Sequence, residues 1–113
     1  MKLDIETFSD TSLENAKVAS DFLKVLGNEN RLIILCALLE HELKVGEMEQ
    51  LLGIRQPTLS QQLARLRAKD LVHTRRVAKE VFYSLANSEV KKTIGVLCNL
   101  FVNQGSKFTK KSC

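Results

Sequence analysis

The chain has 113 residues, of which 44% are hydrophobic and 27% are charged, and its net charge is +4. These values are typical of one globular domain that gains burial by dimerising, and they exclude wholesale disorder. No apolar run approaches the roughly 20 residues that span a bilayer, and the acidic, mixed N-terminal sequence is unlike a signal peptide. Three cysteines, an odd number without close pairing, indicate free thiols in a reducing compartment, so we expect a cytoplasmic protein.

The charge is divided unevenly along the chain. Residues 1–54 hold five basic and ten acidic side chains, a net charge of −5, so residues 55–113 carry +9. Within residues 55–79 alone, seven basic side chains stand against one acidic side chain. This asymmetry indicates a polyanion as the partner of one surface, although a solvated basic face has the same composition. The positions of the basic residues within the predicted elements decide between the two interpretations.

The first half of the chain predicts three helices. The first runs from Asp10 or Ser12 to Leu26 with a broad apolar face, and Gly27 stands where a C-terminal cap belongs. The second covers residues 30–40, which are apolar nearly all round, as is typical of a buried central helix. A polar link then leads to a short third helix over residues 45–52.

The second half predicts a helix, a hairpin and a closing helix. Residues 56–69 form an amphipathic helix in which Leu59, Leu63 and Leu66 recur at helical spacing. Residues 71–85 change to strand character, with a turn near Ala78 and Lys79. The last helix covers residues 89–103, and a short basic tail follows.

The helices over residues 45–52 and 56–69, joined by a glycine-containing turn, have the pattern of a helix–turn–helix. A recognition helix anchors one side in the core and exposes groups that hydrogen-bond base edges on the other. Glutamine pairs with adenine, arginine pairs with guanine, and serine or threonine serves a base or a phosphate. Any helical hairpin in an α-rich domain would show the same apolar pattern. The candidates for base readout are Gln56, Thr58, Ser60, Gln61, Gln62 and Arg65.

Basic residues cluster around the turn of the predicted hairpin. Arg75, Arg76 and Lys79 would lie along the phosphate backbone, which supplies salt-dependent affinity without sequence information. A recognition helix, a basic hairpin and a closing helix follow in the order of a winged helix. The predicted fold is therefore mainly α with a small β-hairpin (α+β), a winged helix–turn–helix with five helices. We expect an N-terminal extension over residues 1–11, the domain over residues 12–104 and the tail over residues 105–113.

Two other classes of function compete with DNA binding. An enzyme is disfavoured because the sequence has no recognisable nucleophile motif and no glycine-rich phosphate loop. The second alternative is a winged helix without a thiol switch that acts through protein partners, through an unidentified effector, or as an anti-repressor that displaces another regulator. A winged helix that binds only proteins has no need for the positive charge at Arg65, Arg75, Arg76 and Lys79.

Four segments resemble the ArsR/SmtB family of winged-helix repressors. They are NRLIILCALLE (residues 30–40), KVGEME (44–49), QPTLSQQLARLR (56–67) and VFYSL (81–85), and the likeness extends over about residues 12–104. The resemblance implies a homodimer built on the first and last helices that represses a promoter by binding double-stranded DNA at an inverted repeat. Both terminal helices are more apolar than one small domain needs, which agrees with this expectation.

The metal sites of the family are not matched in this sequence. The thiolate pair of its arsenic and cadmium sensors lies at the start of the third helix, where this chain has VGEM (residues 45–48). The zinc site in the last helix corresponds to Asn87, Glu89, Leu100 and Asn103, which offer one carboxylate where zinc prefers four ligands. His41 and His73 are lone histidines. We therefore expect no metal and no other cofactor.

The setting of Cys36 is similar to the persulfide- and redox-sensing branch of the family, which includes biofilm-growth-associated repressors and hemolysin regulators. That resemblance implies a small sulfur compound or an oxidant as effector, and a bridge from Cys36 to a cysteine in the last helix that releases DNA. An ungapped alignment places the second cysteine at Val102, whereas Cys98 lies one helical turn earlier.

One helical turn is about 5.4 Å of rise, and this displacement predicts that Cys98 is misplaced for a direct disulfide, whereas a longer polysulfide chain would tolerate it. Cys113 in the tail is another candidate partner. The alternative for all three cysteines is an unreactive thiol, and for Cys36 a small apolar side chain in the core.

Overall fold

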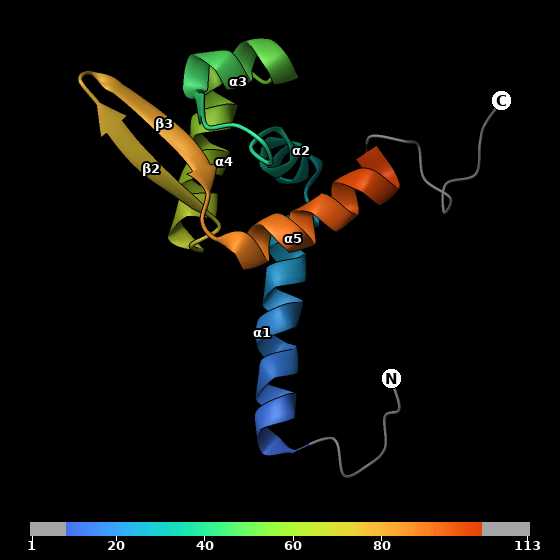
Figure 1. Cartoon of the computed structure of the whole chain (residues 1–113). Coiled ribbons are helices and arrows are strands. Elements are labelled where there is room, and N and C mark those ends of the chain that lie inside the picture. Colours follow the sequence, from blue (N-terminus) through green and yellow to red (C-terminus); the bar gives the residue numbers. More distant parts are fainter. Residues whose placement is uncertain (1–8, 103–113) are drawn as a thin grey trace, which may run out of the picture.

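A computed structural model describes residues 9–102, and five α-helices and a three-stranded sheet make up this part of the chain (Figure 1). The first elements are α1 (Asp10–Leu26), α2 (Glu29–Ala37), β1 (Leu43–Lys44) and α3 (Val45–Leu52). They are followed by α4 (Gln56–Ala68), β2 (Val72–Val77), β3 (Glu80–Leu85), α5 (Ser88–Leu97) and the π-helical turn η2 (Cys98–Val102). The predicted winged helix–turn–helix is thus confirmed.

Short polar residues define where several helices begin. Ser9 accepts a hydrogen bond from the backbone of Ser12 at the start of α1, and Asn28 accepts one from Arg31 at the start of α2. Such side chains satisfy backbone N–H groups that have no partner inside the helix. Gly53 ends α3 with a φ of 69°, a left-handed conformation that glycine adopts without steric cost. This turn directs the chain from α3 into α4.

The sheet is antiparallel with strand order β1-β3-β2. β2 and β3 form the predicted hairpin, in which Val77 pairs with Glu80 around the turn at Ala78 and Lys79. Ala78 has a φ of 55°, a conformation that turns require and that side chains other than glycine adopt rarely. β1 was predicted only as a polar link, because two residues carry no strand periodicity. It forms because Leu43 and Lys44 pair with Tyr83 and Phe82 of the hairpin.

Two helices differ from their predicted bounds. α2 ends at Ala37 rather than residue 40, because the chain must turn there to reach β1 and the sheet. The last helix is α-helical only to Leu97 and continues as the π-helical turn η2 to Val102. The predicted end of that helix at residue 103 and the basic tail lie outside the described residues.

The core joins α2, α3, α4, the hairpin and α5, while α1 contributes little to it. Figure 1 shows α4 between the hairpin and α2, with α1 projecting away from the other helices. Ile34, Met48, Leu63 and Ile94 are among the fully buried side chains, whereas Leu26 is the only buried residue of α1. The broad apolar face predicted for α1 is therefore largely exposed in the single chain.

Candidate nucleic-acid interface and thiol pair

The outer face of α4 carries most of the polar residues predicted for base readout. Leu59, Leu63 and Leu66 anchor the helix, and each is at most 1% exposed. The backbone N–H of Gln56 donates to a carboxylate oxygen of Glu49 at 3.1 Å, which fixes the start of α4 against α3. The side chains that the structure places on the exposed surface are Gln56, Thr58, Ser60, Gln61 and Arg65.

Gln62 is the one predicted readout residue that is half-buried, and it faces α2, while Arg65 is exposed but also lines a hollow toward α1 and α2. The Oε1 atom of Gln62 accepts a hydrogen bond from Nη1 of Arg31 at 3.2 Å. Gln62 was expected on the outer side of the helix with Gln61. In an α-helix, Gln62 lies at the edge of the stripe formed by the three leucines. Its side chain turns toward the core because it accepts the hydrogen bond from Arg31.

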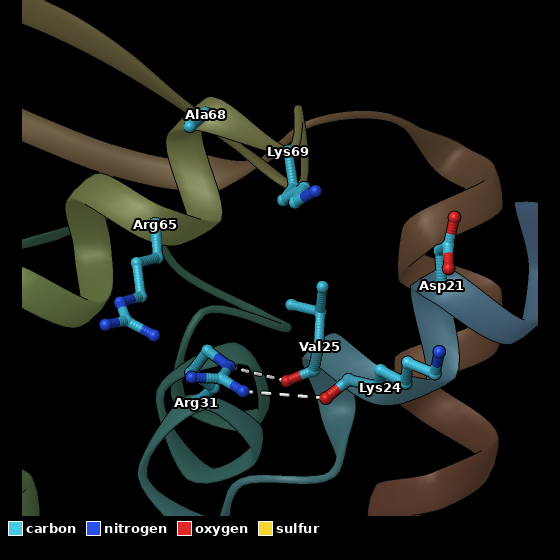
Figure 2. A pocket seen from close by; sticks show the side chains of 7 residues that line it. All are labelled: Asp21, Lys24, Val25, Arg31, Arg65, Ala68 and Lys69. Atoms are coloured by element: carbon cyan, nitrogen blue, oxygen red, sulfur yellow. Dashed lines mark hydrogen bonds between the residues drawn. The ribbon is translucent and has the colours of Figure 1, made fainter.

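Arg31 links three helices and was not recognised from the sequence. Its Nε atom donates to the carbonyl of Val25 at 2.6 Å, and its Nη2 atom lies 3.5 Å from the carbonyl of Lys24 (Figure 2). The same guanidinium therefore holds the C-terminal end of α1 and the side chain of Gln62 on α4. The sequence did contain a signal for this role. An arginine at the start of a largely apolar helix must find hydrogen-bond acceptors when it is partly buried.

The basic hairpin holds one paired and two unpaired cations. Arg75 donates to both carboxylate oxygens of Glu42, at 2.6 and 3.1 Å, and its guanidinium lies 5.1 Å from the ring centroid of Phe82. Arg76 and Lys79 are exposed and form no ion pair within residues 9–102. The three predicted wing residues thus lie together on the hairpin, but Arg75 begins from a paired state.

The Glu42–Arg75 pair changes the proton affinity of both groups. The hydrogen bond from Arg75 lowers the pKa of Glu42, and this effect, with the charge of Arg75, outweighs the opposing effect of desolvation. The hydrogen bond to Glu42, together with its charge, raises the pKa of Arg75. Both groups are therefore ionised at neutral pH, and the pair is an exposed charge-assisted contact that a phosphate group can replace.

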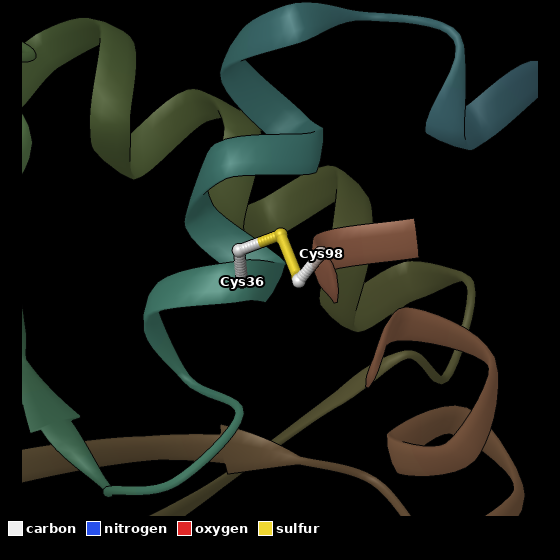
Figure 3. Close-up of a disulfide and its surroundings, with 2 residues drawn as sticks. All are labelled: Cys36 and Cys98. Atoms are coloured by element: carbon white, nitrogen blue, oxygen red, sulfur yellow. A yellow bond between two sulfur atoms is a disulfide. The ribbon is translucent and has the colours of Figure 1, made fainter. Parts of the chain in front are cut away.

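Cys36 of α2 and Cys98 form a disulfide between α2 and the end of α5, with their Cα atoms 6.0 Å apart (Figure 3). The expectation that Cys98 is misplaced by one turn was wrong. Val90, Ile94 and Cys98 recur every four residues and are all buried, so they form one row on the inner face of the last helix. Cys98 therefore faces the core, whereas Val102, four residues further on in the π-helical turn, is 37% exposed. Cys113 lies outside the described residues.

The geometry of the pair distinguishes its two members. Cys36 is half-buried, whereas Cys98 is 1% exposed. Cys36 is therefore the more accessible member of the pair in this structure. Within residues 9–102, no group of three or more histidine, cysteine, aspartate or glutamate side chains could hold a metal ion, and no helix is long and apolar enough to cross a membrane.

A recognition helix packed between two helices and a basic hairpin defines a winged-helix DNA-binding regulator. Residues 28–74 match the family model described as "Bacterial regulatory protein, arsR family". The chain belongs to the ArsR family of bacterial transcriptional regulators, as the resemblance of its sequence motifs predicted, and it is not an enzyme.

Individual relatives support this assignment over most of their length. The chain is 42% identical over 91 residues to the biofilm growth-associated repressor of Xylella fastidiosa, which covers 80% of each chain. It is 48% identical over 88 residues to the transcriptional activator HlyU of Vibrio cholerae, covering 78% of this chain and 82% of HlyU. The solved structure of reduced HlyU from Vibrio cholerae matches with a TM-score of 0.77 and 45% identity, covering 83% of this chain and 99% of that chain.

Proposed function

We propose that the protein is a homodimeric, sequence-specific repressor that leaves an inverted-repeat operator when Cys36 is modified by a persulfide or an oxidant. The observation that carries the thiol part is the placement of Cys36 and Cys98 on facing helices, 6.0 Å apart at Cα. Cα atoms of disulfides usually lie within about 7 Å of each other, so this spacing is that of a direct bridge between the two helices. As a DNA-binding regulator with two reactive thiols, the protein would act in the reducing cytoplasm.

Persulfide chemistry proceeds in two balanced steps at this pair. The Cys36 thiolate takes the outer sulfur of a persulfide R–S–SH, which gives Cys36–S–SH and releases the thiolate R–S⁻. The Cys98 thiolate then attacks the Cys36 sulfur, forming the disulfide and expelling hydrosulfide, HS⁻. A peroxide reaches the same disulfide by taking two electrons from the two thiols through a sulfenic acid on Cys36, with water as the product.

The consequence of the bridge for DNA binding runs through α2. This helix carries Cys36 near its C-terminal end and Arg31 near its start, where Arg31 contacts Gln62 of α4. The Arg31–Gln62 contact belongs to the bridged chain, and we infer that making or breaking the bridge moves α2 and so alters how α2 supports the recognition helix. Closely packed helices move as rigid units. A movement of α2 would therefore reach α4 through the Arg31–Gln62 contact.

The dimer is supported by apolar side chains that the single chain leaves exposed. Leu13, Val18 and Leu23 of α1 are more than 60% exposed. At the other end of the chain, Val96, Leu100, Phe101 and Val102 are also exposed. Pairing these two regions across a two-fold axis would bury them and present two copies of α4 to successive half-sites about one DNA turn apart.

A duplex selected by the reduced protein from a random library provides the test. Glutathione persulfide should raise the dissociation constant of the wild type at least tenfold in fluorescence anisotropy, while Cys36→Ser stays bound. Cys113→Ser is the matched control and should respond like the wild type. Intact-mass measurement should show the treated wild type lighter by two hydrogen atoms. Equal release of wild type and Cys36→Ser would refute the thiol switch, and failure to select any duplex would refute DNA binding.

The alternative of an anti-repressor has one supporting observation, since one relative is named an activator and another a repressor. Both roles use the same DNA contacts and differ in what else occupies the promoter. Transcription from a promoter that carries only the selected operator separates them. A repressor lowers transcription in this minimal system, and an anti-repressor leaves it unchanged until a second regulator is added.

A further inference from the structure

A cleft of about 560 Å³ lies on the side of α4 that faces α1 and α2 (Figure 2). Four of the side chains that line it are basic and one is acidic. None of the four cations forms an ion pair within the described part of the chain. The lining residues are Asp21, Lys24 and Val25 of α1, Arg31 of α2, and Arg65, Ala68 and Lys69 of α4.

Hydrogen bonds from Arg31 fix one wall of the cleft. Arg31 is half-buried and donates to the carbonyls of Val25 and Lys24, so it fixes the turn of α1 from which Lys24 projects. Arg65 and Lys69 are four residues apart on α4, and Figure 2 shows both side chains directed from α4 toward the α1–α2 side. Basic side chains from three helices therefore line one space, and the Lys24 side chain extends along α1 toward Asp21.

The position of the cleft relative to the recognition helix identifies its partner. The major groove is about 12 Å wide, and a helix lying in it has a sugar–phosphate backbone on each side. On one flank of α4, a second hollow formed by Ser60, Arg67 and Tyr83 adjoins the wing. The cleft with Lys24 and Lys69 occupies the other flank. The two flanks of α4 therefore both offer space and positive charge where the two backbones would lie.

We propose that this cleft binds a phosphate of the operator backbone on the side of the groove opposite the wing. Lys24 and Lys69 contact the phosphate, and Arg31 is a positioning residue that holds the α1 end of the cleft. This inference rests on the proposed DNA-binding function, and it extends the interface beyond α4 and the hairpin to the end of α1. Because phosphates carry no sequence information, the contact contributes affinity and register but not base preference.

The test compares Lys24→Ala/Lys69→Ala with Lys91→Ala/Lys92→Ala, which removes the same charge from exposed positions on α5. Each lost phosphate contact reduces the magnitude of the slope of log affinity against log salt by about 0.9, so the cleft variant, which loses one phosphate, should lose about 0.9. The α5 variant should stay near the wild-type slope. The ratio of affinities for the selected duplex and a scrambled duplex should be unchanged in both. Neutral methylphosphonates placed singly along the backbone should weaken the wild type at one flanking position and leave the cleft variant unaffected there.

Several results would overturn the inference while leaving the proposed function intact. Equal slopes for the two double variants would remove the cleft from the interface. A fall in wild-type affinity when inorganic phosphate replaces chloride at constant ionic strength, combined with equal slopes, would assign the cleft to a free anion. If the wild type bound no duplex with a salt-dependent affinity, the proposed function itself would fail.

Discussion

The recognition helix and the first helix use their apolar residues in opposite ways. Over its 13 residues α4 buries Leu59, Leu63 and Leu66, so its polar residues are held on a rigid support. Over its 17 residues α1 buries only Leu26 and leaves Leu23 61% exposed. The reading module is thus complete in one chain, whereas α1 and the end of α5 hold apolar surface that a single chain does not cover.

This difference explains how the proposed regulator divides its tasks. Burial of an apolar side chain contributes about 1.5–3 kcal/mol, so the exposed residues of α1 and η2 represent a substantial reserve for association. We call α2, α3, α4 and the hairpin the rigid half, and α1 with the end of α5 the open half. The rigid half presents side chains to DNA. The open half sets the spacing between the two recognition helices of the dimer. The Cys36–Cys98 pair lies where the two halves meet, on α2 and the end of α5.

The largest expected effect follows from placing a charge on the open half. Leu23→Asp should convert the dimer to a monomer, because the interface would have to bury a carboxylate. Affinity for a duplex with two half-sites should fall roughly 100-fold or more, since linked binding is lost, while affinity for a single half-site should change little. Sedimentation velocity and anisotropy measure the two effects.

Leu51→Asp is the matched control for oligomeric state, because Leu51 is 64% exposed on α3, away from both terminal helices. It should remain a dimer. A dimeric Leu23→Asp protein would show that α1 lies outside the dimer interface. The exposed apolar residues of α1 would then not serve association.

The neighbouring glutamines of α4 provide a finer comparison within the rigid half. Gln61 is exposed, so Gln61→Ala should flatten the preference at one operator position by about 1–3 kcal/mol. Gln62 is bonded to Arg31, so Gln62→Ala should keep the preference and lower the free energy of unfolding by about 1 kcal/mol. A panel of single-base operator variants and urea denaturation measure the two effects. Loss of base preference in Gln62→Ala would instead return Gln62 to the readout set that the sequence predicts.

The fold of the rigid half was predictable because each of its elements has a local signal. The spacing of Leu59, Leu63 and Leu66, the glycine before α4 and the alternation in the hairpin each involve residues close in sequence. β1 was missed because Leu43 and Lys44 form a strand only through pairing with Phe82 and Tyr83, which are distant in sequence. Local periodicity carries no information about such contacts.

The candidate site was predictable in composition but not in pairing. The basic residues of α4 and the wing were found by charge, whereas the partners of Gln62, Arg75 and Cys98 are 31, 33 and 62 residues away. An alignment by position correctly located a cysteine on α2 but placed its partner one turn too far along the last helix. The four-residue row that contains Cys98 was visible in the sequence, but which neighbour it faces depends on how α5 packs against α2.

The smallest expected effect concerns the wing and uses one of these pairings. Glu42→Gln removes the carboxylate that holds Arg75, so Arg75 reaches a phosphate without first breaking an ion pair. The salt dependence should steepen by up to about 0.9 and affinity should rise a few-fold, in a titration of wild type and variant against the selected duplex. Lys44 pairs with Glu80 on the same hairpin, and Glu80→Gln is the control that removes a charge without freeing Arg75. An equal gain in both variants would attribute the effect to net charge alone.

The same pair predicts how stability depends on pH. Because Arg75 lowers the pKa of Glu42, the pair contributes stability above the ordinary glutamate pKa of about 4.3, and this contribution is lost as the pH falls through the lowered value. The difference in unfolding free energy between wild type and Glu42→Gln should therefore be constant around neutral pH and shrink only in acid. Its size should be small, because both groups are exposed to solvent. A difference that changed around neutral pH would mean that another group titrates with the pair, and Arg75 would then be held by more than Glu42.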